Sequence, residues 1–349
     1  MRLGLNMGYW GAGNDAENLE LAREADRLGY SVVWAAEAYG SDAATVLTWV
    51  AAQTERIDVG SAIFQIPGRT PAMTAMTAAT LDTLSGGRFR LGLGISGPQV
   101  SEGWHGVRFD APLGRTREYI DIVNLALSRQ KVDYQGKYYS VPLPDGAGNA
   151  LKLTAHPTRD HVPTYLAAIG PKNLELCGEM CDGWLAIFYS PEHSKDSLGA
   201  VEAGRAKVGK TLEGFDVVPT VPIVIGPDLE QCAFPVRAYA ALYVGGMGSR
   251  DKNFYNQLAC RMGFEEAATE VQNLYLGGDK GGAMMAVPFE FIDQTSLIGP
   301  VERVADGMQA YAEAGVTTLT LASYAGSLEE RVQTLRDGVK ALELSGVGS

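Results

Sequence analysis

Apolar residues recur along this chain in two alternating patterns. Short, mostly apolar runs are typical of strands buried on both faces of a parallel sheet. Longer stretches, in which apolar residues return every three or four positions, predict amphipathic helices. The predicted strands cover residues 2–7, 31–36, 57–64, 88–94, 163–168, 182–188, 215–225 and 316–323. The predicted helices cover residues 17–28, with Asp15 as N-cap, and 42–54, 71–84, 115–128, 171–180, 192–208, 229–244, 254–276 and 327–344, with one more after Pro300.

Eight strand signals that alternate with helices favour a (β/α)8 TIM barrel, an α/β fold. A doubly wound open sheet is the alternative, because a strand count alone does not establish closure. Residues 1–349 fit one barrel domain of about 250 residues with insertions. Two interruptions mark these insertions. They are a hairpin at about 130–159, expected to turn at Gln135-Gly136, and an extra helical segment at about 246–285.

The charge balance limits the partners of the protein. With 29 basic and 41 acidic residues the net charge is −12, so we expect neither a nucleic-acid nor an anionic-membrane surface. The 4 cysteines do not suggest a disulfide framework, and we expect small buried thiols. The chain begins directly in a strand and has no run of about 18 apolar residues. We therefore expect a cytoplasmic protein without a membrane span.

The segment LDTLSGGRFRLGLGISGPQ, residues 81–99, joins a helix, a tight glycine turn and a strand to a loop of small residues. Ligands of α/β barrels bind at such loops, at the carboxyl ends of the strands. The glycines match a dinucleotide fingerprint poorly, because Gly92 and Gly94 fall inside and at the end of the strand and Pro98 interrupts the pattern. We therefore expect tight strand–helix packing there, not a nucleotide site.

A second loop, at Ala168, Ile169 and Gly170, connects a predicted strand to a helix that begins at Pro171. The free N–H groups and the dipole of a helix N-terminus form a ready site for an anion. A simple turn between a strand and a helix explains the same residues equally well. The sequence leaves both readings open.

Acid–base candidates are few. Glu37 follows a predicted strand and is not explained by capping, whereas Asp42 fits a helix N-cap. Among 4 histidines only His105 follows a barrel-strand loop, where it would donate a proton, stack on a ligand or pack as a half-buried helix residue. The sequence has no G-x-S-x-G elbow, H-E-x-x-H pair, phosphate loop or paired C-x-x-C motif. A barrel without its own nucleophile or metal often uses a cofactor.

Four segments together resemble the luciferase-like monooxygenase superfamily, in particular its oxidoreductases that use the deazaflavin coenzyme F420. They are VVWAAEAYGSD, ATLDTLSGGRFRLGLGISGPQVSEGWHG, LAAIGPKNLELCGEMCDGW and IGPVERVADGMQAYAEAGVTTL. The resemblance extends over nearly the whole chain and implies a (β/α)8 barrel with the coenzyme at its C-terminal mouth. The implied coenzyme contacts are Glu37, Ala62 and Ile63 at a non-prolyl cis peptide, Ser96, Gly97, Pro98 and Gln99 beside the ring, and Ala168, Ile169 and Gly170 on the phosphate side.

The resemblance also implies a reaction, the transfer of a hydride between C5 of F420 and an unidentified small organic substrate. Glu37, Gln99 and His105 are then the candidates for ring contact or proton handling. Several deazaflavin enzymes carry an Asp-His pair where this chain has Glu37-Ala38, so their base is absent at this position. The alternatives are an FMN-dependent monooxygenase and a coenzyme-binding barrel without catalysis. A homodimer is the oligomer that the resemblance implies.

Overall fold

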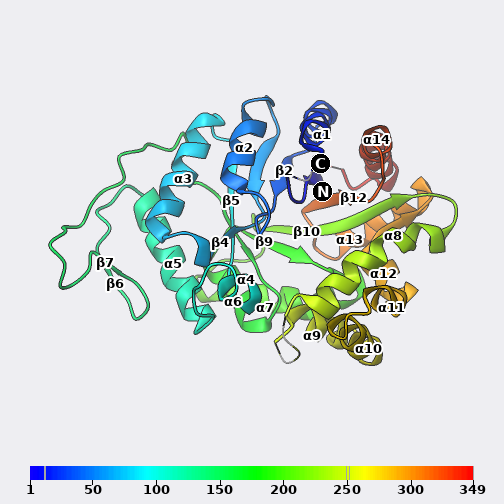
Figure 1. The fold of residues 1–349 in the computed structure, drawn as a ribbon. Coiled ribbons are helices and arrows are strands. Elements are labelled where there is room, and N and C mark those ends of the chain that lie inside the picture. The colour runs from blue at the N-terminus through cyan, green and yellow to red at the C-terminus, as the bar shows by residue number, and fades with distance from the viewer. Residues whose placement is uncertain (12, 249, 251, 349) are drawn as a thin grey trace.

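Eight parallel strands form a closed ring at the centre of the protein (Figure 1). The structure is a computed structural model that describes residues 1–11, 13–248, 250 and 252–348. Within these ranges the ring runs β10–β12–β1–β2–β3–β5–β8–β9 and closes because β9 pairs with β10, which confirms the predicted barrel. The barrel strands are β1 (Arg2–Asn6), β2 (Val32–Ala35), β3 (Asp58–Ser61), β5 (Phe89–Gly94), β8 (Thr164–Ala167), β9 (Gly183–Ile187), β10 (Asp216–Ile225) and β12 (Thr318–Ser323).

Large side chains fill the lumen because glycines on neighbouring strands leave room for them. The indole ring of Trp34 packs edge-on against the ring of Tyr165, with centroids 5.3 Å apart, and both residues are buried. A side chain at Gly60 would collide with Trp34, and one at Gly183 would collide with Tyr165. The lumen is therefore a packed core, as expected for this fold.

An ion cluster closes the lumen at the amino ends of the strands. Arg90 of β5 is buried and donates to the carboxylates of Asp58 at 2.7 Å and Asp216 at 3.2 Å, and to the Tyr165 hydroxyl at 3.3 Å. Arg2 forms a second ion pair with Asp216 at 3.0 Å. Because these residues come from β1, β3, β5, β8 and β10, the cluster links strands around the ring.

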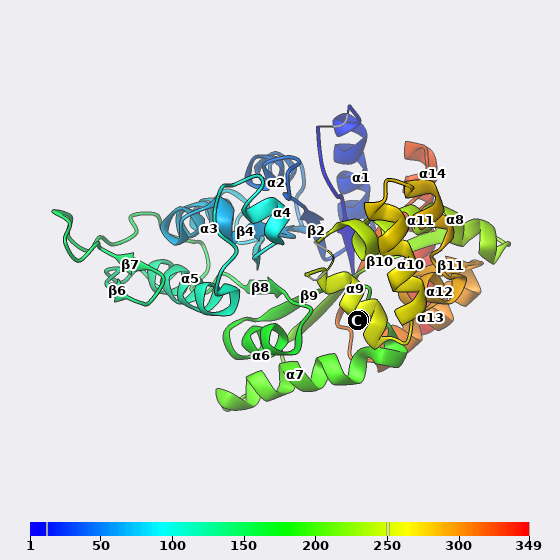
Figure 2. The same cartoon turned by 60° about the horizontal axis from the view of Figure 1, so that its bottom comes forward.

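Helices surround the ring (Figures 1 and 2). Those that connect the barrel strands are α1 (Asp15–Leu28), α2 (Ala43–Ala51), α3 (Pro71–Leu84), α5 (Pro112–Leu127), α6 (Pro171–Met180), α7 (Ser194–Lys207), α8 (Leu229–Ala241) and α13 (Val301–Glu313), and α14 (Leu328–Ser345) follows the last strand. Asp42 caps α2, as predicted, by accepting from the N–H of Thr45. The last helix, α14, packs beside α1 and completes the outer layer. No helix in the described ranges combines the length and apolar character needed to cross a membrane.

The predicted hairpin is present and projects away from the barrel between α5 and β8 (Figure 2). Its strands are β6 (Tyr134–Gln135) and β7 (Ser140–Val141). The N–H of Gly136 bonds to the Tyr139 carbonyl oxygen, so the turn spans residues 136–139 and the turn predicted at Gln135-Gly136 is misplaced. Glu118 of α5 accepts hydrogen bonds from three N–H groups of this turn, at 2.7 to 2.9 Å, and anchors the hairpin to the barrel.

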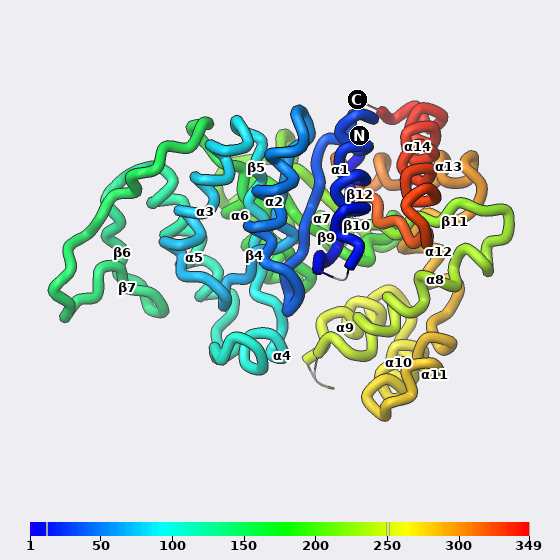
Figure 3. Tube along the Cα trace, turned by 45° about the horizontal axis from the view of Figure 1, so that its top comes forward, coloured from blue at the N-terminus to red at the C-terminus, as the bar shows by residue number. Residues whose placement is uncertain are grey.

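Between α8 and α13 a group of helices lies over one side of the barrel mouth, at the end of the molecule opposite the chain termini (Figure 3). The predicted helix over 254–276 is two helices, because Gly263 ends the first one with a φ of 89°. Residues 249 and 251, in the loop predicted before it, lie outside the described residues. The group comprises the π-helical turn η3 (Leu242–Gly246), α9 (Phe254–Arg261), α10 (Glu265–Leu276), α11 (Lys280–Met285), α12 (Phe289–Thr295) and strand β11 (Leu297–Gly299), which pairs with β10.

Candidate functional site

Three loops at the carboxyl ends of barrel strands hold non-glycine residues in the left-handed backbone region. Ala38 after β2, Ser96 after β5 and Phe188 after β9 have φ values of 42°, 56° and 51°. This conformation is unfavourable for residues with a Cβ, and such strain gathers at functional sites. The mouth of the barrel is therefore the candidate site, in agreement with the position of ligands in this fold.

The third barrel strand is broken at the mouth. The strand predicted over 57–64 ends at Ser61, the Ala62–Ile63 peptide is cis, and β4 (Phe64–Gln65) then pairs with β5. The Ile63 side chain passes over Gly94, where an added Cβ would lie 2.1 Å from its Cδ1 atom. Gly92 likewise leaves room for the carbonyl oxygen of Ser61. These glycines accommodate residues of the neighbouring strand and not of a helix. The expectation of tight strand–helix packing at this point is therefore wrong.

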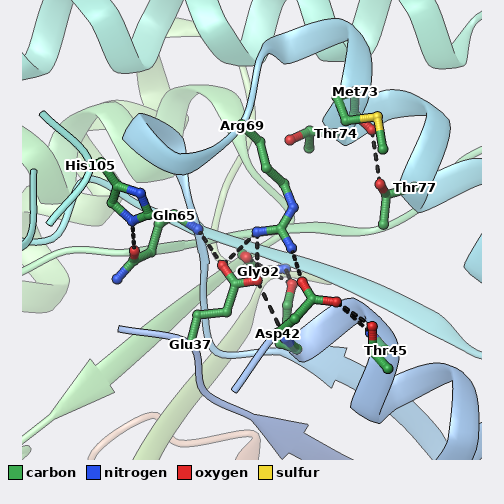
Figure 4. Close-up of polar contacts among 12 residues, drawn as sticks. Glu37, Asp42, Thr45, Gln65, Arg69, Met73, Thr74, Thr77, Gly92 and His105 are labelled. Atoms are coloured by element: carbon green, nitrogen blue, oxygen red, sulfur yellow. Dashed lines mark hydrogen bonds and ion pairs between the residues drawn. The ribbon is translucent and has the colours of Figure 1, made fainter. Parts of the chain in front are cut away.

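Glu37 is buried beside an arginine at the mouth (Figure 4). Its carboxylate accepts from Nη1 of Arg69 at 2.6 Å and from the backbone N–H groups of Gln65 at 3.1 Å and Ala43 at 3.3 Å. The short 3₁₀ turn η1 (Ile66–Gly68) delivers Arg69, which also pairs with Asp42 at 2.6 Å. Because the Glu37 oxygens already have three donors, this carboxylate positions the loops after β2 and β4.

Three polar side chains are linked in a chain beside this ion pair, and Figure 4 shows two of them, His105 and Gln65. Nε2 of His105 donates to Oε1 of Gln65 at 2.6 Å, and Nε2 of Gln65 donates to Oγ of Ser96 at 2.9 Å. Gln65 is only 2% exposed, so its side chain is held in place. Because an amide oxygen can only accept, the imidazole carries a proton on Nε2 and presents Nδ1 on its other side.

The loop after β5 continues into a short helix, α4 (Pro98–Ser101), with Gly97 as its N-cap. Gln99 is exposed on this helix, whereas Glu37 and His105 both contact Gln65. Two of the three predicted catalytic residues therefore share one hydrogen-bonded neighbour, and Gln99 lies apart from it. A side chain at Gly97 would come within 3.9 Å of the Met247 carbonyl oxygen, so this loop borders the helices over the mouth.

The turn after β8 opens helix α6 without a side-chain cap. Gly170 is the N-cap, and a Cβ there would meet nothing within 4 Å, so the backbone at this N-terminus is accessible. Pro171 has no N–H, and the N–H of Asn173 bonds to the Gly170 carbonyl oxygen, so the N–H of Lys172 is the donor left for an anion. Ala168 and Ile169 line a small cavity with Ser190, whose Oγ is buried without a partner among the described residues. Buried polar atoms normally have a partner, and a helix N-terminus attracts anions. Of the two readings left open by the sequence, this geometry favours the anion site.

Sequence reasoning missed Gln65 and Arg69. The available signal for Gln65 was a single amide inside the apolar run AIFQIP, and Arg69 followed as the first basic residue of the next loop. Neither residue belongs to a motif, and each contributes to the site through a contact with a residue far away in the sequence. In the described ranges no group of three His, Cys, Asp or Glu residues could hold a metal ion.

Comparison with known proteins identifies the family. The model of the family described as luciferase-like monooxygenase matches residues 7–318. A putative coenzyme F420-dependent oxidoreductase of Mycobacterium tuberculosis is 42% identical over 337 residues, 95% of this chain and 96% of the relative. The coenzyme F420-dependent tetrahydromethanopterin reductase from Methanopyrus kandleri has the same fold, with a TM-score of 0.82 at 24% identity, over 96% of this chain and 97% of that one.

A further solved structure shares the fold with another cofactor. The oxygenating constituent of 3,6-diketocamphane monooxygenase from Pseudomonas putida, in complex with FMN, has a TM-score of 0.69 at 18% identity, over 98% of this chain and 97% of that one. The closed barrel and a family model that matches most of the chain lead to one assignment. This chain belongs to the luciferase-like monooxygenase family.

Proposed function

We propose that this protein is an F420-dependent oxidoreductase that transfers a hydride between the deazaflavin and an organic substrate. The observation that carries the proposal is the 42% identity, over nearly the full length of both chains, to the putative coenzyme F420-dependent oxidoreductase. The barrel mouth supports it, because strained loops, a broken strand and an open helix N-terminus lie around the same strand ends. When bound, the coenzyme supplies the ring carbon that gives or accepts the hydride.

The residues at the mouth fit such a coenzyme. Ile63 offers an apolar surface to a planar ring, and Gln65 and Ser96 offer polar atoms at its edge. The uncapped N-terminus of α6 offers the N–H of Lys172 and the helix dipole to a phosphate. Nη2 of Arg261 donates to the carbonyl oxygen of Ile169 at 3.4 Å, which brings a positive charge to the same turn.

Glu37 and His105 have different roles in this proposal. Glu37, fixed by Arg69, holds the backbone of Gln65 and so positions the ring edge. His105, with its Nε2 proton committed to Gln65, is the candidate for proton handling through Nδ1. The ring contact expected for Gln99 stays a prediction.

FMN is the second candidate cofactor, because a protein of the same fold was solved in complex with FMN. The two proposals differ in their reaction with oxygen. A reduced deazaflavin reacts poorly with oxygen, whereas a flavin monooxygenase supplied with reduced FMN consumes it. Oxygen uptake therefore separates the two candidates.

A fluorescence titration of the purified protein with oxidised F420, and in parallel with FMN, tests the proposal. Micromolar or tighter F420 binding with weak FMN binding is the expected result. The reverse preference would assign the site to FMN, and binding of neither would contradict both candidates. Gln65→Leu replaces the amide with an apolar side chain that makes no hydrogen bonds, so we expect F420 affinity to fall about ten-fold. Gln333→Leu on the remote helix α14 is the matched control and should bind F420 normally.

A homodimer and a cytoplasmic location also stay predictions. Light scattering on the eluted protein peak measures the mass in solution, and a mass near 37.2 kDa would contradict the dimer.

A further inference from the structure

Five tyrosines from separate parts of the chain meet at the barrel mouth. We call them the tyrosine cluster: Tyr9, Tyr239, Tyr243, Tyr255 and Tyr324. The ring centroid of Tyr243 lies 4.8 Å from that of Tyr239 and 4.8 Å from that of Tyr255, and Tyr239 lies 6.0 Å from Tyr324. Tyr243 is part of the π-helical turn η3, and such turns occur frequently at functional sites.

The tyrosine cluster packs against the ring of Phe188. This ring lies 5.2 Å from Tyr239, 5.8 Å from Tyr243 and 6.3 Å from Tyr255. The strained backbone of Phe188, with a φ of 51°, is therefore held by contacts with three tyrosines. Phe188 also lines the small cavity of Ala168, so the cluster adjoins the anion-binding turn.

The barrel mouth is thus divided into two halves. The polar half, with Glu37, Gln65 and His105, follows β2 to β5. The aromatic half, with the tyrosine cluster and Phe188, follows β9, β10, β12 and β1. The halves meet in the loop after β2, because a side chain at Gly40 would collide with the ring of Tyr9. A ring bound to the polar half would therefore turn its free side toward the tyrosines.

The hydroxyl groups of the tyrosine cluster are neutral donors. Those of Tyr9 and Tyr243 are paired with each other, and because a hydroxyl both donates and accepts, Tyr243 can accept from Tyr9 while it donates to a ligand. Neither Tyr255 nor Tyr324 has a hydrogen-bond partner for its hydroxyl within the described part of the chain. Burial raises the pKa of Tyr255 to about 12, and burial together with neighbouring tyrosines raises the pKa of Tyr243 well above its usual range. Burial has the largest effect on these pKa values, and neighbouring tyrosines follow it.

This environment selects the kind of molecule that it can hold. An ionised ligand would lose water here without gaining a charged partner, which is unfavourable. An apolar body would pack on the tyrosine and phenylalanine rings, and an oxygen atom would accept from their hydroxyls. Tyr9 is 46% exposed, so the cluster can be reached from solvent.

We propose that the tyrosine cluster binds the substrate, and that this substrate is an uncharged, largely apolar molecule whose carbonyl oxygen accepts hydrogen bonds from Tyr243 and its neighbours. The inference rests on the proposed function. When the carbonyl carbon receives a hydride from the reduced coenzyme, the C=O π bond opens and its electron pair moves to the oxygen, where the same hydroxyls would stabilise the negative charge. The oxygen then takes up a proton, and the product is an alcohol. It assigns the substrate class and the residues that position the substrate.

Binding of 4′-fluoroacetophenone to the coenzyme-free protein, followed by fluorine NMR, tests this inference without turnover. The anion 4-fluorobenzoate has the same ring and serves as the charged comparison. We expect the ketone to bind at least ten-fold more tightly than the benzoate. This ratio corresponds to a difference of ~1.4 kcal/mol in binding free energy. Equal affinity for the two probes, or no ketone binding, would overturn the inference.

Two variants locate the probe. Tyr243→Phe keeps the ring and removes one hydroxyl, so the ketone affinity should fall about five-fold, the effect of one neutral hydrogen bond. Tyr134→Phe removes a hydroxyl from the remote hairpin, where it bonds to Asp121, and should leave the affinity unchanged. Unchanged binding in Tyr243→Phe would refute the role of the cluster.

An F420 titration of the same proteins separates this inference from the proposed function. F420 affinity should be equal in the wild type and in Tyr243→Phe, because the coenzyme is assigned to the polar half. Absence of F420 binding in the wild type would overturn the proposed function and the hydride-acceptor role of the ligand. The ketone titration would still decide whether the cluster is a site for neutral carbonyl compounds.

Discussion

Removal of Arg69 is the sharpest test of how the polar half of the mouth is built. Arg69→Met keeps an unbranched side chain of similar length but leaves the Glu37 carboxylate, 7% exposed, without its cation. Loss of one partner from a buried pair destabilises a protein by about 3–5 kcal/mol. Because the N–H groups of Gln65 and Ala43 still donate to Glu37, we expect the lower end, about 3 kcal/mol.

The complementary change has a smaller expected effect. Glu37→Gln removes the negative charge while Arg69 retains Asp42 as a partner, so we expect a loss of about 1–2 kcal/mol. In the double variant the same ion pair is lost only once. The double variant should therefore be more stable than the sum of the single losses predicts, by at least about 1 kcal/mol.

Urea unfolding, followed in parallel by tryptophan fluorescence and far-ultraviolet circular dichroism, measures these free energies, and coincident curves establish two-state behaviour. Arg23→Met is the control, because Arg23 forms an exposed pair with Glu20 whose loss should change stability by no more than about 0.5 kcal/mol. An Arg69→Met loss no larger than this control would refute the reasoning. Strict additivity in the double variant would refute it as well.

Two further predictions concern the scaffold. Gly92→Ala would place a methyl group 1.8 Å from the Ser61 carbonyl oxygen, so we expect insoluble protein or a loss of about 3 kcal/mol or more in urea unfolding. Gly199→Ala on the open face of α7 meets nothing within 4 Å and should instead stabilise by about 0.5–1 kcal/mol. The hydrogen bond to Asp182 raises the pKa of His161, so this stabilisation is present below about pH 6.5 and is lost as the pH rises through the folded-state pKa. In His161→Gln the free energy of unfolding should therefore depend less on pH above neutral pH. The difference from the wild type should be less than about 1 kcal/mol because the side chain is exposed.

The alternation of strands and helices could be predicted because each element carries its own hydrophobic period. The hydrophobic period does not reveal where a continuous helical pattern is interrupted. Gly263 lies inside a stretch with helical spacing, and only its left-handed backbone separates α9 from α10. Strand β11 has three residues, too few for any period to show. Closure of the ring depends on contacts between β9 and β10 that no local pattern contains.

The candidate site was predictable in position but not in its pairings. Loops after barrel strands pointed to the mouth, and the resemblance implied the cis peptide at Ala62–Ile63 that the structure contains. The sequence did not indicate that Arg69, 32 residues away, forms an ion pair with the Glu37 carboxylate. The tyrosine cluster as a set was not predictable for the same reason, since Tyr9, Tyr239 and Tyr324 lie far apart in the sequence.

The ion cluster around Arg90 has a kinetic consequence. Together with the Trp34 and Tyr165 rings above it, the cluster seals the lumen at one end, so no molecule can pass through the barrel. Both ligands of the proposed reaction must then enter and leave through the same mouth. Because the polar and aromatic halves share this opening, a high concentration of one ligand should slow the entry and release of the other.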